Sequence, residues 1–363
     1  MEEWKYQYWL QSITGIKNKK KQILVEYCGG AKELYYMKEK QLASIYGILQ
    51  EEIDEILATK KSWDLNKEAE WLEAAGVSMV SIEDKCFPKR LYCLGDCPYA
   101  VFYKGNFPTE NEPTAAIVGS RACSEYGRTI ALELGKKLSA CGISVVSGMA
   151  VGIDSFGHWG AIHGNGKTYA VLGCGVDVCY PNNKGGRELY HRILEKGGIL
   201  SEYSPGTVPA PWRFPARNRL ISAFSDIIIV VEAKKKSGSL ITADFALEQG
   251  KDVYAVPGRL DDASSYGCNA LIKQGAGIIV SVEELLLDLD LCMDKILPLQ
   301  EKRKKSLEKQ ELLLYSCFGL HTKNLEELMQ MTGLSSSEVT DVVVRLQEKG
   351  FIEETFKNHY RKK

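Results

Sequence analysis

The 363-residue sequence lacks any run of the roughly 18 apolar residues that a membrane-spanning helix requires. Its first ten residues, MEEWKYQYWL, do not follow the pattern of a secretory signal peptide. We therefore expect a cytoplasmic protein. The sequence also lacks an excess of positive charge, since its net charge is −1. A site for nucleic acid would thus need a local concentration of cationic side chains.

Patterns that mark metal centres and catalytic nucleophiles are missing too. The 11 cysteines are scattered, and the most closely spaced pairs lack the spacing of a zinc site. Gly164–Thr168 ends like a phosphate-binding P-loop, but Ala161 stands where the first glycine is required. His158 and His163 are not spaced as zinc ligands, and we expect His158 to pair with Asp154 at a helix start. We predict no metal, no cofactor and no catalysis.

Residues 1–75 are rich in Lys, Glu, Leu and Tyr and contain no β-branched runs, which predicts a helical domain. Within it, LQSITGIKNKKKQILVEYCGGAKEL resembles a helix-hairpin-helix element, a binder of the DNA backbone. Asn18 stands near the place of the second hairpin glycine and tolerates a left-handed backbone. A structural or protein-docking role is the alternative. The candidate DNA contacts of this element are Lys17, Lys19, Lys20 and Lys21.

We interpret residues 76–112 as a connector, because they end in the Pro- and Asn-rich KGNFPTENEPT. From Ala115 onward, short apolar runs that end in Gly, Ser or Pro alternate with helical segments such as Gly127–Cys141 and Leu240–Gly250. This alternation predicts an α/β domain over residues 113–289, with a parallel sheet covered by helices on both faces.

A charged stretch over residues 290–305 is predicted to be a linker, and residues 306–363 to be a second helical domain. Ser335 and Glu338 have the spacing of a capping box at the start of its clearest helix, which Gly350 ends. An upstream short helix and a following β pair predict a winged helix. Its exposed face is not basic, so we expect this domain mainly to dock protein, or to touch DNA only through its wing and tail, at Lys357, Arg361, Lys362 and Lys363.

Ligands of doubly wound sheets bind beyond the carboxyl ends of the strands. Small residues follow three of the predicted strands, where backbone N–H groups at a helix start can bind anions. Each turn alone fits a structural role equally well, and Lys234–Lys236 also fits a solvated loop. The residues of these turns are Gly119, Ser120 and Arg121; Ser147, Gly148 and Met149; and Ser237, Gly238 and Ser239.

The segment WRFPARNRL, just before the apolar run DIIIVVEA, concentrates Arg213, Arg217 and Arg219 within seven positions. We interpret it as an Arg-rich loop, because the planar guanidinium fork grips phosphate oxygens in pairs. Proteins that bind single strands add aromatic rings to such a cationic track, and the candidates here are Tyr180, Trp212 and Phe214. Ordinary packing is the alternative role for Trp212 and Phe214. The structural alternative is that Arg217 or Arg219 pairs internally with Glu202, Asp226 or Glu232.

Six segments that occur in a fixed order over about residues 80–285 match the motifs of a known family. They are AIVGSR, VSGMAVGIDSFGHWGA, VLGCGVDVCYP, ILSEYSPGTVPAPWRFPARNRLIS, VVEAKKKSGSLITADFALEQGKDVYAVPG and GCNALIKQGA. They closely resemble the DNA-processing protein A (DprA/Smf) family. The resemblance implies an extended Rossmann-like domain flanked by a SAM-like amino-terminal domain and a winged helix. It also implies a non-catalytic homodimer that binds incoming single-stranded DNA, protects it during natural transformation and helps load the RecA recombinase.

The resemblance also indicates which residues would contact DNA. The family uses a basic residue after its YP motif, and here Lys184 and Arg187 both qualify. The full predicted set is Gly119, Ser120, Arg121, Ser147, Gly148, Met149, Lys184, Arg187, Phe214, Arg217, Asn218, Arg219, Ser237, Gly238 and Ser239.

Two other functions compete with this one. Related Rossmann-like enzymes hydrolyse nucleotide N-glycosidic bonds through a PGGxGTxxE motif, which SGSLITADFALEQG resembles in position. Its acid would be Asp244 or Glu248, but the glycines are fewer here. The other alternative is a sequence-specific regulator that acts through the winged helix.

Overall fold

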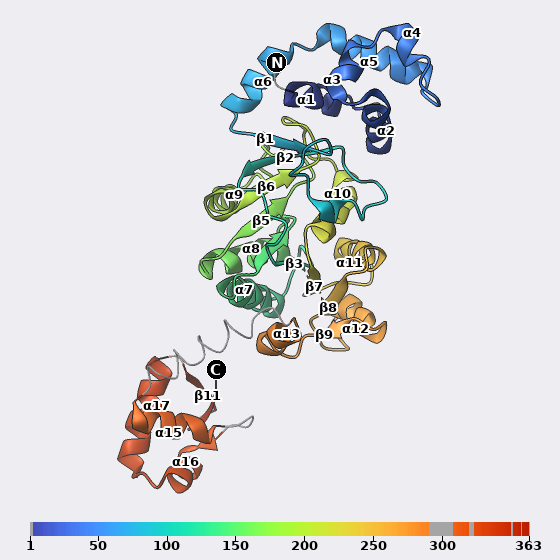
Figure 1. The fold of residues 1–363 in the computed structure, drawn as a ribbon. Coiled ribbons are helices and arrows are strands. Elements are labelled where there is room, and N and C mark those ends of the chain that lie inside the picture. Colours follow the sequence, from blue (N-terminus) through green and yellow to red (C-terminus); the bar gives the residue numbers. More distant parts are fainter. Residues whose placement is uncertain (1–2, 290–307, 319–322, 350, 357, 363) are drawn as a thin grey trace. The chain divides into compact units, whose positions relative to one another are not determined.

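The computed structural model describes residues 3–289, 308–318, 323–349, 351–356 and 358–362 (Figure 1). The chain forms two units, Met1–Leu291 and Cys292–Lys363. The predicted linker over residues 290–305 and the predicted helix end at Gly350 lie outside the described residues. Within the described part of the chain, no helix is both long enough and apolar enough to cross a bilayer.

The first unit begins with six helices: α1 (Trp4–Ser12), α2 (Asn18–Cys28), α3 (Ala31–Tyr36), α4 (Glu39–Leu42), α5 (Gln50–Ser62) and α6 (Leu65–Ala74). They pack around fully buried side chains such as Trp9, Leu24 and Ile56. Gly29 ends α2 in the left-handed conformation at φ 87°, which glycine adopts without steric cost. Helix α6 starts at Asp64, whose carboxylate accepts hydrogen bonds from two backbone amides of the first turn.

The centre of this unit is a nine-stranded sheet with the order β1-β2-β6-β5-β4-β3-β7-β8-β9. All pairings from β6 to β9 are parallel, so the predicted parallel sheet is confirmed. The strands of this parallel part are β3 (Thr114–Val118), β4 (Ser144–Ser147), β5 (Thr168–Val171), β6 (Gly198–Ser201), β7 (Ile227–Val230), β8 (Asp252–Ala255) and β9 (Gly277–Ile278).

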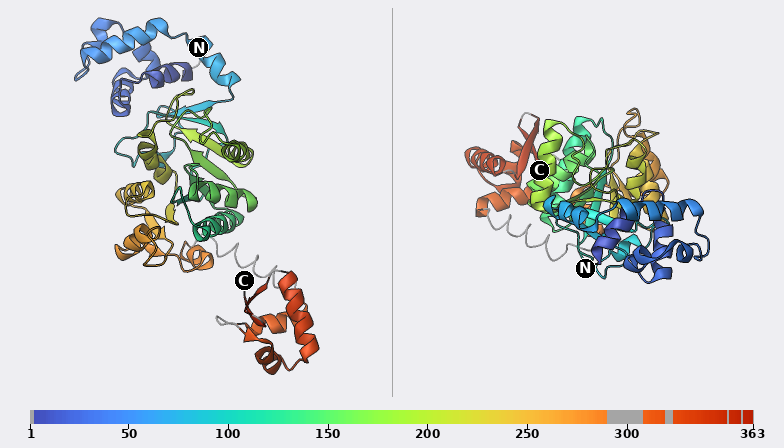
Figure 2. Two further views of the ribbon diagram at one scale, coloured as in Figure 1. Left: turned by 180° about the vertical axis from the view of Figure 1, so that it is seen from behind. Right: turned by 90° about the horizontal axis from the view of Figure 1, so that it is seen from above.

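Helices cover both faces of the sheet, as Figures 1 and 2 show. One face carries α7 (Glu125–Ala140), α8 (Ile153–His163) and α9 (Lys184–Lys196), and the other carries α10 (Arg213–Ala223), α11 (Gly238–Glu248) and α12 (Tyr266–Lys273). A last helix, α13 (Val282–Asp288), packs near α7. Because both faces are covered, all four residues of the strand Ile227–Val230 are buried, which explains its unbroken run of β-branched side chains.

The interpretation of residues 76–112 as a connector is corrected by the structure. The segment forms β1 (Ser78–Ser81), the 3-10 turn η1 (Lys89–Leu91) and β2 (Ala100–Gly105). Strand β2 pairs antiparallel with both β1 and β6, so the segment extends the sheet by two strands. Strands β1 and β2 have only four and six residues, and the stretches around them contain Gly and Pro. An apolar pattern this short cannot be distinguished from a loop by sequence alone.

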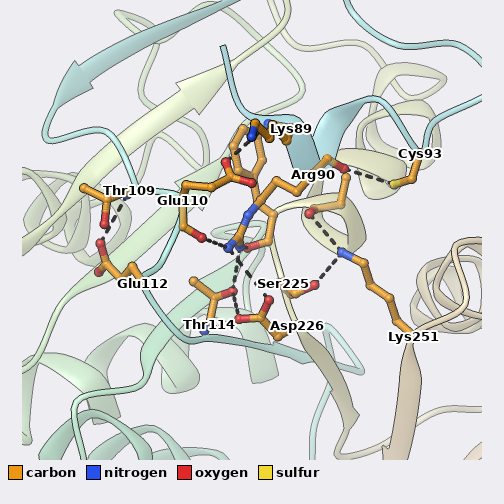
Figure 3. Close-up of polar contacts among 12 residues, drawn as sticks. Lys89, Arg90, Cys93, Thr109, Glu110, Glu112, Thr114, Ser225, Asp226 and Lys251 are labelled. Carbon is orange, nitrogen blue, oxygen red and sulfur yellow. Dashed lines mark hydrogen bonds and ion pairs between the residues drawn. The ribbon is translucent and has the colours of Figure 1, made fainter. Parts of the chain in front are cut away.

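Arg90 fixes this segment to the amino-terminal ends of the parallel strands (Figure 3). Its Nη1 donates to Thr114 Oγ1 at 3.0 Å and to the carbonyl of Phe224 at 2.9 Å, and its Nη2 donates to the carbonyl of Glu110 at 2.9 Å. The amide of Thr114 in turn donates to Asp226 Oδ2 at 2.7 Å. This network ties the segment to the chain at the starts of β3 and β7, the end of the sheet opposite the carboxyl ends of these strands.

The second unit contains α15 (Lys309–Cys317), β10 (Lys323–Asn324), α16 (Leu325–Thr332), α17 (Ser336–Glu348), β11 (Ile352–Phe356) and β12 (His359–Lys362). The capping box of Ser335 and Glu338 is confirmed, because each side chain bonds the backbone amide of the other residue. Gly333, at φ 70°, makes the tight turn between α16 and α17. Strands β11 and β12 pair antiparallel, as the predicted wing requires.

Candidate nucleic-acid interface

A pocket of about 480 Å³ opens at the carboxyl edge of the sheet. Strand β3 pairs with β4 on one side and with β7 on the other, so the chain order reverses at β3. Such a reversal leaves a crevice, because the loops after the two strands lead to helices on opposite faces. The loops after β3 and β7, together with the first turns of α10 and α11, line the pocket, which we call the switch-point pocket.

Nine of the fifteen predicted contact residues line this pocket: Gly119, Ser120, Arg121, Phe214, Arg217, Asn218, Ser237, Gly238 and Ser239. They come from three segments that are far apart in the sequence. The structure therefore brings together the turn after β3, the start of α10 and the start of α11. Ser147, Gly148, Met149, Lys184, Arg187 and Arg219 are not part of its lining.

The pocket is strongly cationic. Its lining contains four cationic side chains, Arg121, Arg217, Lys234 and Lys236, against the single carboxylate of Asp154. The 11-residue helix α11 adds the positive end of its dipole, since its first backbone amides follow Ser237 at the pocket. Sequence reasoning left Lys234 and Lys236 out of the site as a possible solvated loop. Their position directly before the Ser237–Ser239 turn was the signal that could have included them.

Aromatic side chains stack at one side of the pocket. The rings of Tyr180 and Phe214 are 5.2 Å apart at an interplanar angle of 27°. The guanidinium carbon of Arg121 lies 5.4 Å from the centre of the Phe214 ring, in cation–π range. Tyr180 is 38% exposed and Arg121 is exposed, so a ring face and a cation are both available to a ligand. Phosphate and an unpaired base could be held side by side here.

The arginine-rich segment is a helix and not the predicted loop. Helix α10 begins at Arg213, so Pro215 lies in its first turn, where the missing amide breaks no helical hydrogen bond. At the other end, Lys251 Nζ donates to the carbonyls of Ser222 at 2.7 Å and Ala223 at 2.9 Å. A cation at the carboxyl end satisfies the last carbonyls and opposes the helix dipole. The helix geometry distributes the three arginines over different environments.

Arg217 lies beneath the pocket with only 4% of its surface exposed. Its Nη1 donates to the carbonyl of Gly148 at 3.0 Å and to that of Val171, so it joins α10 to the ends of β4 and β5. Position 148 must be glycine for this approach, because a Cβ there would lie 2.6 Å from Arg217 Nη2. Burial lowers the pKa of Arg217 to about 10, which leaves the guanidinium charged at neutral pH.

Arg219 points away from the switch-point pocket. Its Nη2 donates to both carboxylate oxygens of Glu202, at 2.7 and 2.8 Å, and both side chains are largely buried. This is the internal ion pair that the sequence offered as the alternative. Residues two positions apart on a helix differ by about 200° in direction, so Arg217 and Arg219 cannot share one face. The three guanidinium groups therefore do not form one continuous phosphate track.

Comparison with known proteins identifies the family. The sequence profile of the DNA recombination-mediator protein A family matches residues 78–290, more than half of the chain. The chain belongs to this family. Among its relatives, the DNA processing protein DprA of Streptococcus pneumoniae is 43% identical over 210 residues, which cover 58% of this chain and 73% of the relative. Protein Smf of Escherichia coli is 33% identical over 288 residues, 78% of this chain and 76% of the relative.

Solved structures agree with this assignment. The crystal structure of Streptococcus pneumoniae DprA aligns with a TM-score of 0.68 and 34% identity, over 79% of this chain and 98% of that one. DprA of Helicobacter pylori, solved in a study of its single-stranded DNA binding mode, aligns with a TM-score of 0.53 and 30% identity, over 59% and 97% of the two chains. The α/β fold of this DprA/Smf family member is thus shared with solved members.

The turn after β4 forms the buried floor of the site in this DprA/Smf protein. Ser147 Oγ donates to the carbonyl of Ile117 at 2.6 Å, and the amide of Gly148 donates to Asp154 Oδ2 at 3.1 Å. Met149 is fully buried and has a positive φ of 57°. Burial raises the pKa of Asp154, and the charge of Arg217 acts in the opposite direction. Ser147, Gly148 and Met149 thus support the pocket from below without lining it.

The expected pair of His158 and Asp154 is corrected. The His158 ring is fully buried, and its Nδ1 lies 2.6 Å from Thr168 Oγ1 on β5. Burial and the nearby charge of Arg217 lower the pKa of His158 to about 3, so the ring is neutral at physiological pH.

Lys184 and Arg187, the two candidates after the YP motif, are both exposed in the first turn of α9. That helix starts at Asn183, whose side chain accepts from the amide of Gly186 at 2.7 Å. Both cations extend to solvent, and both follow the segment that contains Tyr180.

The helix-hairpin-helix expectation is corrected in three details. The hairpin amide of Gly15 donates to Glu55 Oε1 at 2.8 Å, so a carboxylate occupies it. Asn18 does not take a left-handed conformation but begins α2, and its Nδ2 donates to Glu202 Oε1 at 2.6 Å. Lys21 is 3% exposed and donates to the carbonyl of Gln11, and burial lowers its pKa to about 7. These contacts favour the structural alternative for the hairpin.

Proposed function

We propose that this protein binds single-stranded DNA in the switch-point pocket, protects incoming strands and helps load RecA onto them during natural transformation and homologous recombination. The observation that carries the proposal is the pocket itself, where four cations and a helix start surround an exposed aromatic stack. Family membership and the single-stranded DNA binding of the Helicobacter pylori relative support it.

The pocket favours a single strand over a duplex for a physical reason. In a duplex the base faces are covered by their neighbours and cannot stack on Phe214 or Tyr180, whereas a single strand can turn its bases outward. Its phosphates would then lie against Arg121, Lys234 and Lys236, which belong to the loops at the pocket. Because ring faces and phosphates are common to all nucleotides, this grip does not depend on base sequence.

We further propose that the protein acts without catalysis and in the cytoplasm. The competing function, hydrolysis of a nucleotide N-glycosidic bond, would need an acid at the pocket. Asp244 and Glu248, its two candidates, are both exposed on α11, and neither lines the pocket. The carboxylate that does line it, Asp154, accepts a backbone hydrogen bond and lies beside the guanidinium of Arg217, an arrangement that suits a structural role.

A homodimer is also part of the proposal. Strand β9 is the edge of the sheet, and its outer side has no partner strand among the residues that the structure describes. Ile278 in this strand is 50% exposed, and Val280 directly after it is 67% exposed. Apolar side chains gathered at a sheet edge are typical of surfaces that a second subunit covers.

A competition experiment tests the binding proposal. A fluorescently labelled single strand is bound to the full chain, and unlabelled single strand, duplex or mononucleotide is added while anisotropy is recorded. We expect only the single strand to compete effectively and Arg121→Glu to abolish binding in a protein that remains folded. Equal competition by a mononucleotide, or nucleotide hydrolysis in a parallel assay, would favour the enzyme. RecA loading is measured as the rate of RecA filament formation on a strand already covered by a single-strand binding protein.

A further inference from the structure

Helix α10 faces a second depression besides the switch-point pocket. This second depression is a groove of about 1240 Å³. On the side of α10 it is lined by the capping residue Trp212 and by Arg213, Ala216 and Arg219. The opposite wall of this groove comes from the helical amino-terminal part of the same unit, including Lys17, Lys67 and Trp71. We call it the N-terminal groove. The next residue of α10, Phe214, already lines the switch-point pocket, so the two depressions lie on different sides of the first turn of this helix.

Exposed indole rings are the unusual feature of the N-terminal groove. Trp212 is 64% exposed and Trp71 is 45% exposed, although an indole ring is large and mostly apolar. Tyr203, which is partly buried, packs edge-on against Trp212 with 6.4 Å between ring centres. Large aromatic faces left open in a concave surface mark a binding site.

Arg213 orders these rings. Its guanidinium carbon lies 4.8 Å from the centre of the Trp212 ring and 5.1 Å from that of Tyr203, and its Nη1 donates to the carbonyl of Val208. The cation thus holds both rings in place before any ligand arrives. A preorganised aromatic surface loses less conformational entropy on binding than a mobile one.

The charge of the groove suits a polyanion. Its lining contains five cations, Lys17, Lys21, Lys67, Arg213 and Arg219, and three carboxylates, Glu68, Asp96 and Glu202. The difference is a net charge of +2 with Lys21 protonated, and it falls towards +1 at neutral pH because burial lowers the pKa of Lys21 to about 7. Glu202 already accepts hydrogen bonds from Arg219 and Asn18, so it repels a phosphate less than a free carboxylate would. Lys17 and Lys67 are exposed and can reach a strand at the rim.

We propose that the N-terminal groove is a second subsite for the same single strand, whose bases stack on Trp212 and Trp71 after the strand passes the first turn of α10. The proposal rests on the function proposed for the switch-point pocket, because that pocket, on the other side of the first turn of α10, identifies the occupant. A peptide is the other occupant that exposed tryptophans could bind. The nucleic acid is favoured because both depressions combine cations with open ring faces and share one helix.

The experiment compares a short and a long oligonucleotide, dT6 and dT20, by anisotropy with the full chain. We expect Trp212→Ala to weaken dT20 by about 5- to 140-fold, the range for loss of one base–aromatic stack, and dT6 by less than about twofold. Trp71→Ala should act in the same direction, and Trp212→Phe should restore most of the affinity. Tyr46→Ala is the matched control, since Tyr46 is 97% exposed and lines neither depression. Melting curves check that each variant is folded.

The variant Arg121→Gln distinguishes a failure of the second subsite from a failure of the function proposed for the switch-point pocket. If Arg121→Gln weakens both oligonucleotides while Trp212→Ala and Trp71→Ala change neither, the groove is not a nucleic-acid subsite and a peptide becomes its better occupant. If Arg121→Gln changes neither oligonucleotide, the proposed function fails instead. Photo-crosslinking of dT20 that contains 5-iododeoxyuridine gives an independent result. Crosslinks to the peptides that contain Trp212 or Trp71 are expected, and crosslinks confined to the switch-point pocket would overturn the second subsite.

Discussion

Arg121 and Arg219 belong to the same predicted set of DNA contacts, yet the structure gives them different environments. Arg121 is exposed at the switch-point pocket, where its guanidinium lies over the Phe214 ring. Arg219 is 9% exposed and donates to both oxygens of Glu202. Replacing each by glutamine should therefore affect different properties. Arg121→Gln should weaken DNA binding, and Arg219→Gln should weaken the fold.

The expected magnitudes follow from these environments. Removing one partner of a buried ion pair costs about 3 to 5 kcal/mol, because the other charge remains buried. Asn18 also donates to Glu202, so we expect Arg219→Gln to lower the free energy of unfolding by about 3 kcal/mol, the lower end of that range. Arg121→Gln should change the free energy of unfolding by less than about 0.5 kcal/mol. It removes one phosphate contact, which lowers the steepness of log K against log salt by about 0.7.

Two measurements on the same preparations check this reasoning. Anisotropy with a single-stranded oligonucleotide over about 50 to 200 mM salt gives the salt slope, and thermal denaturation gives stability. Arg259→Gln is the matched control, because Arg259 is exposed but paired with Asp261 at 2.8 Å and lines neither depression. An unchanged salt slope in Arg121→Gln would refute the role of the pocket. A reduced slope in Arg219→Gln without loss of stability would refute the internal role of that arginine.

Three further predictions concern other parts of the chain. Phe214→Ala should weaken single-strand binding by about 1 to 3 kcal/mol without a change in salt slope, because it removes a stacking ring and no charge; anisotropy measures this. His158→Gln should make the protein less sensitive to acid. In the folded protein the pKa of His158 is about 3, below the ordinary 6.5, so the unfolded chain binds the proton at a higher pH than the folded chain does. The free energy of unfolding of the unmodified protein therefore falls by about 1.4 kcal/mol per pH unit as the pH drops from 6.5 towards 3. Denaturant titrations of both proteins across this pH range give the free energy of unfolding at each pH. This free energy should fall less steeply with decreasing pH in the variant, and an equal dependence on pH would contradict the low pKa of His158. Deletion of residues 306–363 should leave single-strand affinity nearly unchanged, since the exposed side of α17 carries Glu338 and Asp341; a large loss in a filter-binding assay would show that this domain holds DNA.

The sheet and the position of the pocket could be predicted from the sequence because both depend on local patterns. Runs such as Ile227–Val230 are apolar at every position, which occurs where helices cover both faces of a parallel strand. The turn at Gly119–Arg121 follows one such strand directly, and the turn at Ser237–Ser239 comes after the loop that follows another. Since parallel strands end at one edge, these turns had to lie together, and the structure places both in the lining of one pocket.

Properties that depend on contacts between distant segments could not be predicted. The pairing of Arg219 with Glu202 spans 17 positions, and nothing local distinguishes it from the other carboxylates that were considered. The loop expected around Pro215 is a helix, because proline is tolerated in the first turn of a helix. The sequence alone does not show whether a proline interrupts a helix or lies in its first turn. Strands β1 and β2 are recognisable by their antiparallel pairing with the sheet and not by their short sequences.

The arginines of α10 indicate how a cationic site can be both rigid and open. Arg217 donates hydrogen bonds to the carbonyls at the ends of β4 and β5, and its charge lies beside the carboxyl group of Asp154. These contacts fix the floor of the pocket. Asn218 is engaged as well, because its amide donates to the carbonyl of Gly238 at 3.1 Å. The groups that remain exposed are Arg121 and the lysines before α11. Buried polar groups thus hold the pocket in shape, while exposed cations and rings are left for features that all nucleotides share. A strand gripped in this way could be passed along without regard to its sequence, as the proposed loading of a recombinase would require.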